Sequence, residues 1–436
     1  MRRSRSAFCD DGGRGGWNAS SLRDEALLRN AAALASDAPL SVYVHIPFCV
    51  RKCPYCAFTS LVPASGGIID AYLEALEGEL ARWTETAGRM FCAETLYIGG
   101  GTPSLLAPRQ WERLIGILEG GLRFLPGAEV SVEANPESLA AASLRLWRDW
   151  RISRVSLGVQ SFDEEDLAWL RRPHSAARAR DALSACLAAG FRTSVDLMFG
   201  LPFQTLHRWH RTLQELLRSG VRHLSLYQLS LEKDSVWGVC PPSEPLPDGY
   251  AFYRFAQWYL RRKGYGQYEI ASFAASGEWC RHNLAYWRGG NVLGLGAAAW
   301  GFLEGIRYGN GNDVARYVAE ARRKGAVSVE ERLEGRKRAG EAAVLALRTA
   351  GGVRLRSFAR RHGPDEAARL VRCLEPFGER FLRRESGRIA FSPGGMRVAN
   401  ALWTEVLADD EETLLRKRVP CPAGSAAVDV TLREGT

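Results

Sequence analysis

An apolar strand leads directly into a cysteine-containing loop in the stretch Ser41-Val42-Tyr43-Val44-His45-Ile46-Pro47-Phe48-Cys49-Val50-Arg51-Lys52-Cys53-Pro54-Tyr55-Cys56. The β-branched and apolar residues of its first half are typical of a buried strand. Its second half has the spacing C-x3-C-x2-C, and three thiolates so close together can hold one 4Fe–4S cluster and leave one iron open to a further ligand. A structural zinc site is the alternative, but zinc needs a fourth cysteine or histidine, and the loop offers no good candidate.

Short apolar runs and amphipathic stretches alternate after this loop. The predicted strands are Ser41–His45, Glu94–Ile98, Glu129–Glu133, Arg154–Val159, Arg192–Met198 and His223–Gln228. The predicted helices are Ile69–Thr86, Pro108–Leu118, Ala140–Arg148, Glu164–Leu170, Ser175–Ala189 and Thr205–Ser219. This alternation predicts an α/β fold, a partial (β/α)6 barrel of the TIM type, with the chemistry at the C-terminal ends of the strands.

The alternation weakens after Leu231, and the chain ends in a smaller helical pattern. A helix is predicted at Tyr250–Lys263, and a compact α-rich, winged-helix-like domain with a hairpin at Phe381–Phe391 and a helix at Pro393–Leu407 is predicted near the C-terminus. The predicted organisation is a flexible leader (1–38), the barrel core (39–235), an extension packing on the barrel (236–328), the small domain (329–415) and a loose tail (416–436).

Composition and charge exclude several classes of protein. The net charge is +9, but the arginines are dispersed and form no basic stripe with aromatic residues, so no nucleic-acid partner is predicted. The ten cysteines include seven scattered ones, which is not the pattern of a disulfide scaffold. No apolar run approaches the roughly 18 residues of a membrane span. Near the N-terminus, acidic residues interrupt the stretch where a signal peptide would have its apolar core. These features predict a cytoplasmic protein.

The sequence resembles the radical S-adenosylmethionine (SAM) family, in the group of the oxygen-independent coproporphyrinogen III oxidases and HemW. The resemblance covers roughly residues 42–348. Its matching pieces are Tyr43–Cys49 (YVHIPFC), Gly99–Pro103 (GGGTP), Glu133–Pro136 (EANP), Gly158–Phe162 (GVQSF), Asp196–Pro202 (DLMFGLP) and Cys280–Trp287 (CRHNLAYW). It implies that Cys49, Cys53 and Cys56 hold a 4Fe–4S cluster, which donates an electron to the sulfonium of SAM to give methionine and a 5′-deoxyadenosyl radical.

The same resemblance implies a set of SAM-binding residues. They are Tyr43, Tyr55, Gly100, Gly101, Thr102, Glu133, Gln160, Arg172 and Asp196. Glycines let the backbone approach a ligand, and free amides there can bind a carboxylate. Glu133, Gln160 and Asp196 each fall near the end of a predicted strand, which places them on one rim of a barrel. The alternative for each of these residues, taken singly, is a helix cap or a solvated loop residue.

A second informative segment is Cys280–Trp287. Imidazole and thiolate can both ligate heme iron, and Tyr286 and Trp287 could stack on a porphyrin. The alternative for His282 is a hydrogen-bonded structural histidine. The resemblance implies heme binding in this segment, with His282 and Cys280 as the candidate ligands.

Two functions are compatible with this resemblance. One is a heme chaperone, which passes heme to an acceptor protein and needs an electron donor for its cluster. The other is a coproporphyrinogen dehydrogenase-type oxidoreductase. The oxidases of this group carry a fourth cysteine two positions after the third, where this chain has Phe58, and this difference favours the chaperone. A pure interaction protein, with the C-terminal domain docking the acceptor, is a third class. Peripheral contact with a membrane acceptor fits the chaperone as well.

Several positions depart from the family pattern. Ala57 replaces an acidic residue, Phe203 replaces a glycine, and Trp300 stands where relatives often have histidine. Arg171 also replaces a glycine, which puts the geometry of its neighbour Arg172 in question. These changes leave the cysteines and the strand-end residues intact.

Overall fold

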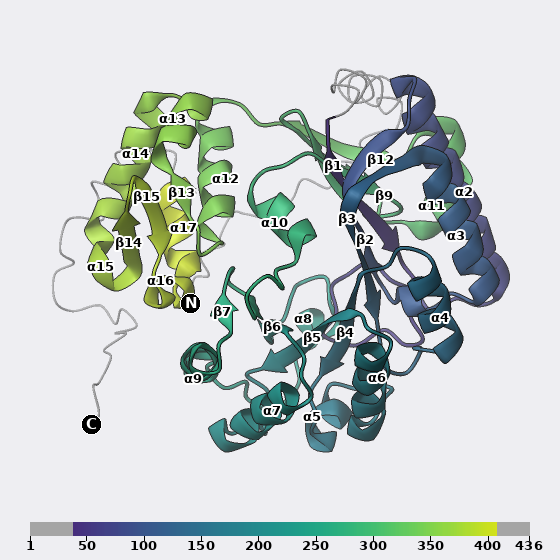
Figure 1. Ribbon diagram of the computed structural model, residues 1–436, viewed down its shortest axis with the longest axis horizontal. Coiled ribbons are helices and arrows are strands. Elements are labelled where there is room, and N and C mark those ends of the chain that lie inside the picture. Colours follow the sequence, from purple (N-terminus) through teal and green to yellow (C-terminus); the bar gives the residue numbers. More distant parts are fainter. Residues whose placement is uncertain (1–37, 408–436) are drawn as a thin grey trace, which may run out of the picture.

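The computed structural model describes residues 38–407, without the side chains of residues 322–324. Its centre is a run of six parallel strands, in the order β1(Leu40–Ile46), β2(Phe91–Gly100), β3(Leu122–Ala134), β4(Arg154–Gln160), β5(Arg192–Phe199) and β6(His223–Gln228). All six strands predicted from the sequence are present. They curve around a shared interior, as Figure 1 shows, and confirm the partial barrel.

Helices cover the outer face of these strands (Figure 1). They are α2(Gly66–Ala87), α3(Pro108–Gly121), α4(Ala141–Asp149), α5(Glu164–Trp169), α6(Ala176–Ala188) and α7(Leu206–Arg218), with a 3-10 turn η2(Pro103–Leu105). The side chains of Asp163, Ser175 and Thr205 accept hydrogen bonds from backbone amides and so cap three of the helices. Gly88 ends α2 in the left-handed conformation, at φ 64°.

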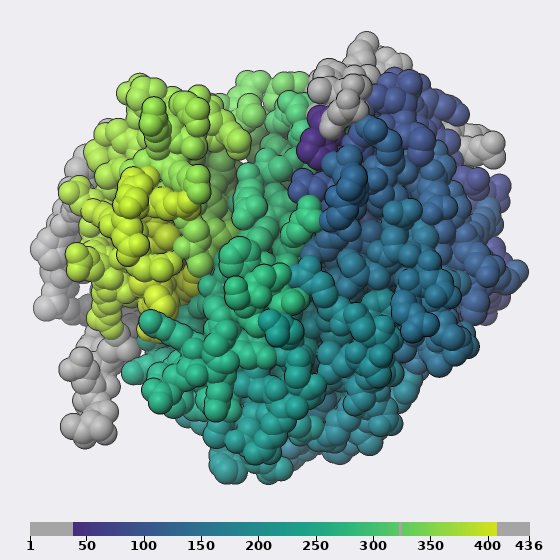
Figure 2. All heavy atoms as spheres, in the orientation of Figure 1, coloured from purple at the N-terminus to yellow at the C-terminus, as the bar shows by residue number. Residues whose placement is uncertain are grey.

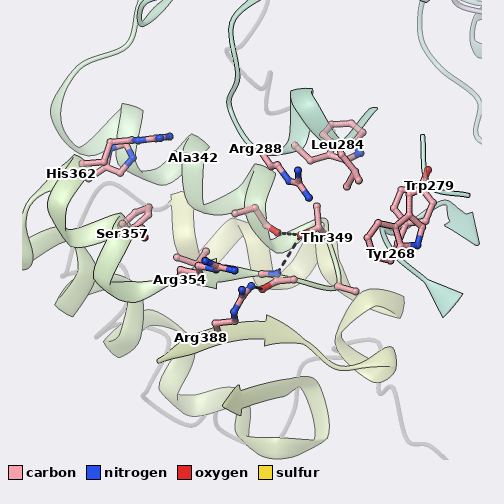
Figure 3. A pocket seen from close by; sticks show the side chains of 18 residues that line it. Tyr268, Trp279, Leu284, Arg288, Ala342, Thr349, Arg354, Ser357, His362 and Arg388 are labelled. Carbon is pink, nitrogen blue, oxygen red and sulfur yellow. Dashed lines mark hydrogen bonds between the residues drawn. The ribbon is translucent and has the colours of Figure 1, made fainter. Parts of the chain in front are cut away.

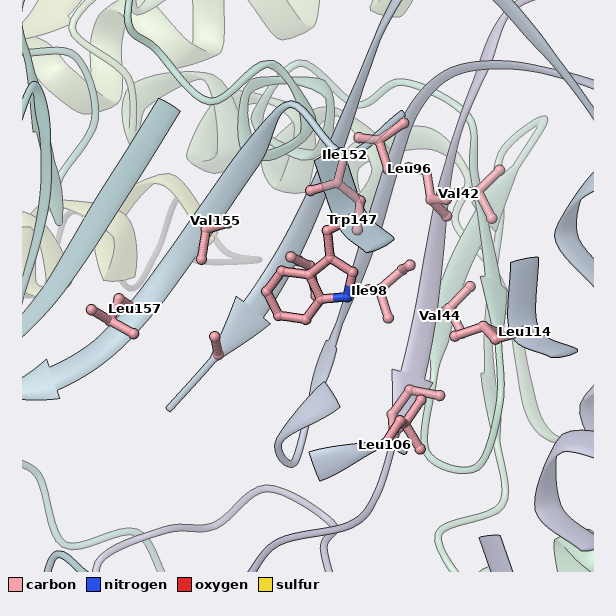
Figure 4. Close-up of a cluster of buried hydrophobic side chains, with 14 of the residues drawn as sticks. Val42, Val44, Leu96, Ile98, Leu106, Leu114, Trp147, Ile152, Val155 and Leu157 are labelled. Carbon is pink, nitrogen blue, oxygen red and sulfur yellow. The ribbon is translucent and has the colours of Figure 1, made fainter. Parts of the chain in front are cut away.

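The core lies between the helices and the sheet. Trp111 and Trp147 come from α3 and α4, are fully buried, and meet edge to face with ring centroids 5.2 Å apart. Figure 4 shows Trp147 among apolar strand residues, including Ile98 and Val155. Burying an aromatic side chain of this size is among the largest single contributions to the hydrophobic core.

The segment predicted as an extension on the barrel adds strands to the barrel sheet itself. On one side, β9(Val292–Leu295) pairs in parallel with β1 and is followed by the antiparallel β10(Trp300–Leu303), β11(Ile306–Asn310) and β12(Val327–Arg332). On the other side, β8(Ser272–Ala274) and β7(Gly266–Gln267) follow β6. These strands cover the edges of the six-stranded core, which would otherwise expose unpaired backbone groups.

Four helices accompany this extension. They are α8(Val236–Val239), α9(Tyr250–Arg262), α10(Arg281–Trp287) and α11(Val314–Lys324). Helix α10 lies between the barrel and the C-terminal helices in Figure 1, and Figure 2 shows the C-terminal region (green to yellow) beside the barrel (blue to teal). It therefore brings the segment that the sequence associates with heme to the junction of two parts of the molecule.

The C-terminal region has its own buried cluster, which includes Leu347, Leu374 and Phe391. Its elements are α12(Gly335–Leu347), β13(Val353–Arg354), α13(Leu355–His362), α14(Pro364–Leu374), η3(Glu375–Phe377), α15(Gly378–Phe381), β14(Leu382–Glu385), β15(Arg388–Phe391), α16(Pro393–Arg397) and α17(Ala399–Leu407). The strands form an antiparallel sheet in the order β13-β15-β14. Helices around a small sheet agree with the winged-helix-like prediction, although the helix predicted at 393–407 is divided in two at Val398.

The remaining predictions concern the chain ends and the membrane. The predicted leader, apart from residue 38, and the predicted tail lie outside the described residues. None of the helices described in the structure is long and apolar enough to cross a membrane.

Candidate functional site

The cysteine loop is held against the end of β1 by backbone hydrogen bonds. The amide of Cys49 donates to the carbonyl of Leu61 at 3.0 Å, and the amide of Leu61 donates to the carbonyl of Pro47 at 2.8 Å. Within the loop, the amide of Cys56 donates to the carbonyl of Cys53 at 3.1 Å. The loop therefore leaves and returns at the same rim of the barrel, with its three cysteines unbridged.

His45 fixes the base of this loop. Its Nε2 atom lies 2.8 Å from the carbonyl oxygen of Thr59 and must donate to it, so Nδ1 accepts from the hydroxyl of Tyr43 at 2.9 Å. Burial lowers the pKa of His45, which keeps the ring neutral as this arrangement requires. Tyr43, a predicted SAM contact, thus also positions the start of the loop.

Two hydrogen-bond donors reach the cysteine sulfurs from other elements. The hydroxyl of Thr102 lies 3.5 Å from Cys49 Sγ, and Arg172 Nη1 lies 3.3 Å from Cys53 Sγ. Burial raises the pKa of Cys49 and Cys56, but metal binding deprotonates a coordinating thiol. In the described part of the chain, no three His, Cys, Asp or Glu side chains converge as a single bound ion would require. Three thiols with donors to two of them fit a cluster whose ligands bind different irons.

The glycine loop at the end of β2 packs against the cysteine loop. The amides of Gly101 and Thr102 donate to the carbonyls of Ile46 and Phe48, at 2.9 and 2.7 Å. Gly100 has φ 110°, and a Cβ atom there would lie 2.5 Å from the His45 ring. Close packing therefore requires glycine at this position. The amides that we expected to be free are bonded within the protein, so the role of Gly100, Gly101 and Thr102 toward SAM stays a prediction.

Glu133 and Asp196 come from β3 and β5 and bring negative charge to the barrel interior. Glu133 accepts hydrogen bonds from the Tyr97 hydroxyl and from the amide of Gly100, both at 2.9 Å. The hydroxyl of Ser156 lies 3.2 Å from Asp196 Oδ2. Burial, followed by the charge of Glu133, raises the pKa of Asp196 to about 7. The interior thus holds a carboxyl group that titrates near neutrality, and such groups cluster at functional sites.

Gln160 and Arg171 adopt backbone conformations that are unusual for residues with side chains. Gln160, at the end of β4, has φ 67°, and Arg171 has φ 54°. Strained residues of this kind are concentrated at functional sites. The value at Arg171 shows that this position would suit glycine, because glycine reaches the left-handed region without steric cost. Arg172 nevertheless reaches Cys53, so the substitution of its neighbour has not displaced it.

Tyr55 lies in the cysteine loop and packs toward α8. Its ring centroid is 6.1 Å from that of Trp237, and the amide of Trp237 donates to the carbonyl of Pro54 at 2.9 Å. Helix α8, which follows the barrel strands, therefore supports the cysteine loop from outside the predicted barrel core.

His282 and Cys280 are both buried, 2% and 3% exposed. His282 Nδ1 lies 2.8 Å from the hydroxyl of Thr95, which itself donates to Ser41 at 2.8 Å. The proton between His282 and Thr95 therefore sits on Nδ1, and Nε2 keeps its lone pair. Nε2 is buried and has no hydrogen-bond partner among the residues that the structure describes. Burial lowers the pKa of His282 to about 3, so this nitrogen is chemically able to ligate a metal.

Glu129 anchors the segment that carries these two residues. Its Oε1 atom accepts hydrogen bonds from the amides of Arg281 and His282, at 2.7 and 3.1 Å, and Cys280 Sγ lies 3.6 Å away. Its other oxygen accepts from Arg154 Nε at 3.3 Å, and both side chains of this ion pair are almost fully buried. The Arg154–Glu129 ion pair was not predicted from the sequence, although two opposite charges in neighbouring predicted strands would have indicated it.

The barrel and its three-cysteine loop define the class of this protein. The sequence model of the radical SAM superfamily matches residues 43–216, which contain the loop and the strand ends described above. Proteins of this class use a 4Fe–4S cluster together with SAM.

Within that class, the chain belongs to the HemW family. It is 32% identical over 381 residues to the heme chaperone HemW of Lactococcus lactis, covering 85% of this chain and 98% of that relative. It is 38% identical over 266 residues to the heme chaperone HemW of Escherichia coli, covering 60% and 70%. Among solved structures, the coproporphyrinogen III oxidase HemN of Escherichia coli shares the fold with a TM-score of 0.77, at 23% identity, covering 88% of this chain and 93% of that one.

Proposed function

We propose that this protein binds heme and transfers it to an acceptor protein. The observation that carries the proposal is the match to the Lactococcus lactis heme chaperone, which extends over 98% of that relative. The oxidase HemN shares the fold at 23% identity, which supports a common architecture alone. Phe58 supports the same choice, because it stands at the position where the oxidases carry their fourth cysteine.

Cys49, Cys53 and Cys56 are the proposed ligands of the 4Fe–4S cluster. When bound, the cluster supplies an electron for reductive chemistry on SAM. The protein itself contributes the Thr102 and Arg172 donors, which lie within hydrogen-bond distance of the sulfurs of Cys49 and Cys53. The proposed SAM contacts are Tyr43, Tyr55, Gly100, Gly101, Thr102, Glu133, Gln160, Arg172 and Asp196.

His282 is the proposed heme ligand of the barrel interior, with Cys280 beside it. The free lone pair of His282 Nε2 supports this assignment. Cys280 is a weaker candidate, because burial raises the pKa of its thiol to about 12 and its sulfur is directed to Glu129. The cysteines in the described part of the chain are unbridged, which fits a reducing compartment such as the cytoplasm. The electron donor and the acceptor protein are further proposed partners, the acceptor docking on the C-terminal domain.

Anaerobic reconstitution separates this function from that of an oxidase. The protein with reconstituted cluster is incubated with SAM, a reductant and coproporphyrinogen III, and the products are separated by chromatography. We expect no catalytic formation of protoporphyrinogen. In parallel, the protein is loaded with hemin and mixed with an apo-hemoprotein, and we expect heme to move to the acceptor. Turnover of coproporphyrinogen would contradict the chaperone function, and so would failure of the protein to bind hemin.

A further inference from the structure

A large cavity lies between helix α10 and the C-terminal domain, away from the cysteine loop. Its volume is about 790 Å³, which is in the range of small-molecule sites. Leu284 and Trp287 line it from α10, while Thr349, Arg354 and His362 line it from the C-terminal domain. Figure 3 shows Leu284, Thr349, Arg354 and His362 around a common opening. Junctions between domains are a frequent place for ligand sites.

The charge of this cavity is entirely positive. Four arginines line it, Arg288, Arg354, Arg361 and Arg388, and no carboxylate does. Arg388 donates to the carbonyl of Gly351 at 3.1 Å. The guanidinium groups of the other three make no hydrogen bond or ion pair within the described residues. Uncompensated arginines on several sides of one cavity are suited to a ligand with more than one carboxylate.

Aromatic surface lines the same cavity. Tyr268, Trp279, Trp287 and Phe358 contribute to its wall. The Nε1 atom of Trp287 is buried and has no hydrogen-bond partner in the described range 38–407. The Arg348 guanidinium lies 4.3 Å from the Trp287 ring centroid. Flat apolar walls combined with unpaired cations fit a planar apolar ligand that carries anionic groups.

His362 stands at the edge of the cavity and has a free imidazole. Its ring centroid is 4.6 Å from that of Phe358, and it makes no hydrogen bond within the described residues. Partial burial and the neighbouring charges of Arg361 and Arg338 lower its pKa, so the imidazole is neutral near pH 7. A neutral imidazole beside a porphyrin-sized space can ligate heme iron.

A second cavity of about 240 Å³ adjoins the first at His362. Both cavities are lined by Arg288, Ala342, Arg361 and His362, and the second adds Trp300 and Phe302. The imidazole therefore borders open space on two sides. A ligand placed in the first cavity can extend past His362 instead of ending against it.

We propose that this cavity is a second heme site, separate from His282, where heme is held accessible for transfer. His362 ligates the iron, and the arginines bind the propionates. The inference rests on the proposed function and extends it. His282 is 2% exposed and its site is enclosed, whereas heme that is passed on must be reachable by the acceptor protein. Helix α10 borders both sites, since it carries His282 as well as Leu284 and Trp287.

Hemin titration of the full-length protein tests the proposal through the Soret band. The variants are His362→Ala, His362→Gln and Arg354→Gln/Arg361→Gln, each made in the wild-type and in the His282→Ala background. Exposed His207 and Arg360, which do not line the cavity, give the matched controls His207→Ala and Arg360→Gln. Circular dichroism verifies that each variant folds. The dimethyl ester of hemin, which lacks the carboxylates, is the second probe.

We expect His282→Ala to retain hemin, with a spectrum that changes when His362 is removed as well. The double arginine variant binds hemin about tenfold more weakly but binds the dimethyl ester as before, since the lost contacts involve carboxylates. If His282→Ala abolishes binding, or if the His362 and arginine changes have no effect, the cavity is not a heme site although the proposed function stands. If the wild-type protein binds no hemin, the proposed function itself fails.

Discussion

Arg172 Nη1 lies 3.3 Å from Cys53 Sγ, so an arginine that follows α5 in the chain contacts the cysteine loop that follows β1. Its other terminal nitrogen donates to Asn135 Oδ1 at 2.9 Å and to the carbonyl of Gly158 at 3.0 Å. One guanidinium thus links the proposed cluster site to the ends of β3 and β4. Planarity and multiple donors make arginine suited to this role.

Replacing Arg172 is expected to weaken the cluster site. Lysine keeps the positive charge but cannot make three directed hydrogen bonds. We therefore expect Arg172→Lys to weaken SAM binding and cluster retention almost as much as Arg172→Gln does. We expect both variants to bind SAM about tenfold more weakly and to lose the cluster faster in air, since a charge-assisted hydrogen bond of about 1.5–3 kcal/mol is removed. Iron and sulfide content and equilibrium SAM binding measure this. Wild-type behaviour of Arg172→Lys would show that charge alone suffices.

Replacing the loop cysteines should remove the cluster. Cys49→Ala, Cys53→Ala and Cys56→Ala are each expected to abolish the visible absorbance of the reconstituted protein, because two thiolates do not hold a 4Fe–4S cluster. Cys240→Ala is the matched control, since this thiol is free and exposed. Iron and sulfide per chain are the measurement. A full complement of iron in any of the three loop variants would rule that cysteine out as a ligand.

Asp196 should make stability depend on pH. Its pKa is about 7 in the folded chain against an ordinary value of 3.8. A raised pKa means that the folded state holds the proton more tightly, so this contribution to stability is complete below about pH 4 and is lost as the pH rises through 7. Asp196→Asn cannot ionise, so its free energy of unfolding should rise relative to that of wild type as the pH is raised from 5 to 8. Urea unfolding at pH 5 and at pH 8 measures this. An equal difference between variant and wild type at the two pH values would refute the prediction.

The buried Arg154–Glu129 pair should be important for stability. Removing one partner leaves an uncompensated buried charge, which typically costs about 3–5 kcal/mol. We therefore expect Arg154→Ala and Glu129→Ala to lower the free energy of unfolding by about that amount, and Glu129→Ala also to loosen α10, whose first amides it holds. Arg180→Ala is the control, because its pair with Glu215 is half exposed and worth under about 1 kcal/mol. Equal losses in all three variants would contradict this account.

The left-handed backbone at Arg171 should tolerate glycine and reject β-branched residues. Arg171→Val is expected to lower the free energy of unfolding by about 1–3 kcal/mol, because β-branched side chains clash in this region. For Arg171→Gly, relief of backbone strain stabilises the folded state, while the greater conformational freedom of glycine stabilises the unfolded state. We therefore expect the free energy of unfolding to change by less than about 1 kcal/mol. Chemical denaturation measures both. A stable valine variant would show that the backbone relaxes out of this conformation.

The strands could be predicted well because their signals are local. His223–Gln228 has the same bounds in the prediction and in the structure, since a short apolar run there follows the amphipathic stretch Thr205–Ser219. The third strand is longer than predicted, Leu122–Ala134 instead of Glu129–Glu133, and it passes through Pro126 and Gly127, which otherwise indicate a turn. The register of its pairing with β2 shifts at this point, so Pro126 and Gly127 are accommodated by an irregularity in the strand pairing.

The candidate site could be predicted in composition but not in arrangement. The cysteine spacing and the strand-end positions of Glu133, Gln160 and Asp196 are properties of the sequence. That the amide of Gly100 is occupied by Glu133, and that Glu129 holds the amide of His282, depends on residues about 30 and 150 positions apart along the chain. Local patterns carry no information about such contacts.

By itself, the sequence determined the partial barrel, the three-cysteine loop and the absence of a fourth cysteine at Phe58, because strand periodicity and ligand spacing act over a few residues. Only the tertiary structure decided that Arg172 reaches Cys53, that His282 is enclosed with a free Nε2, and that the extension completes the barrel sheet. It also placed His362 together with four arginines in the lining of one cavity beside α10. These relationships arise from packing between distant segments, which is specified by the whole core and not by any one stretch of it.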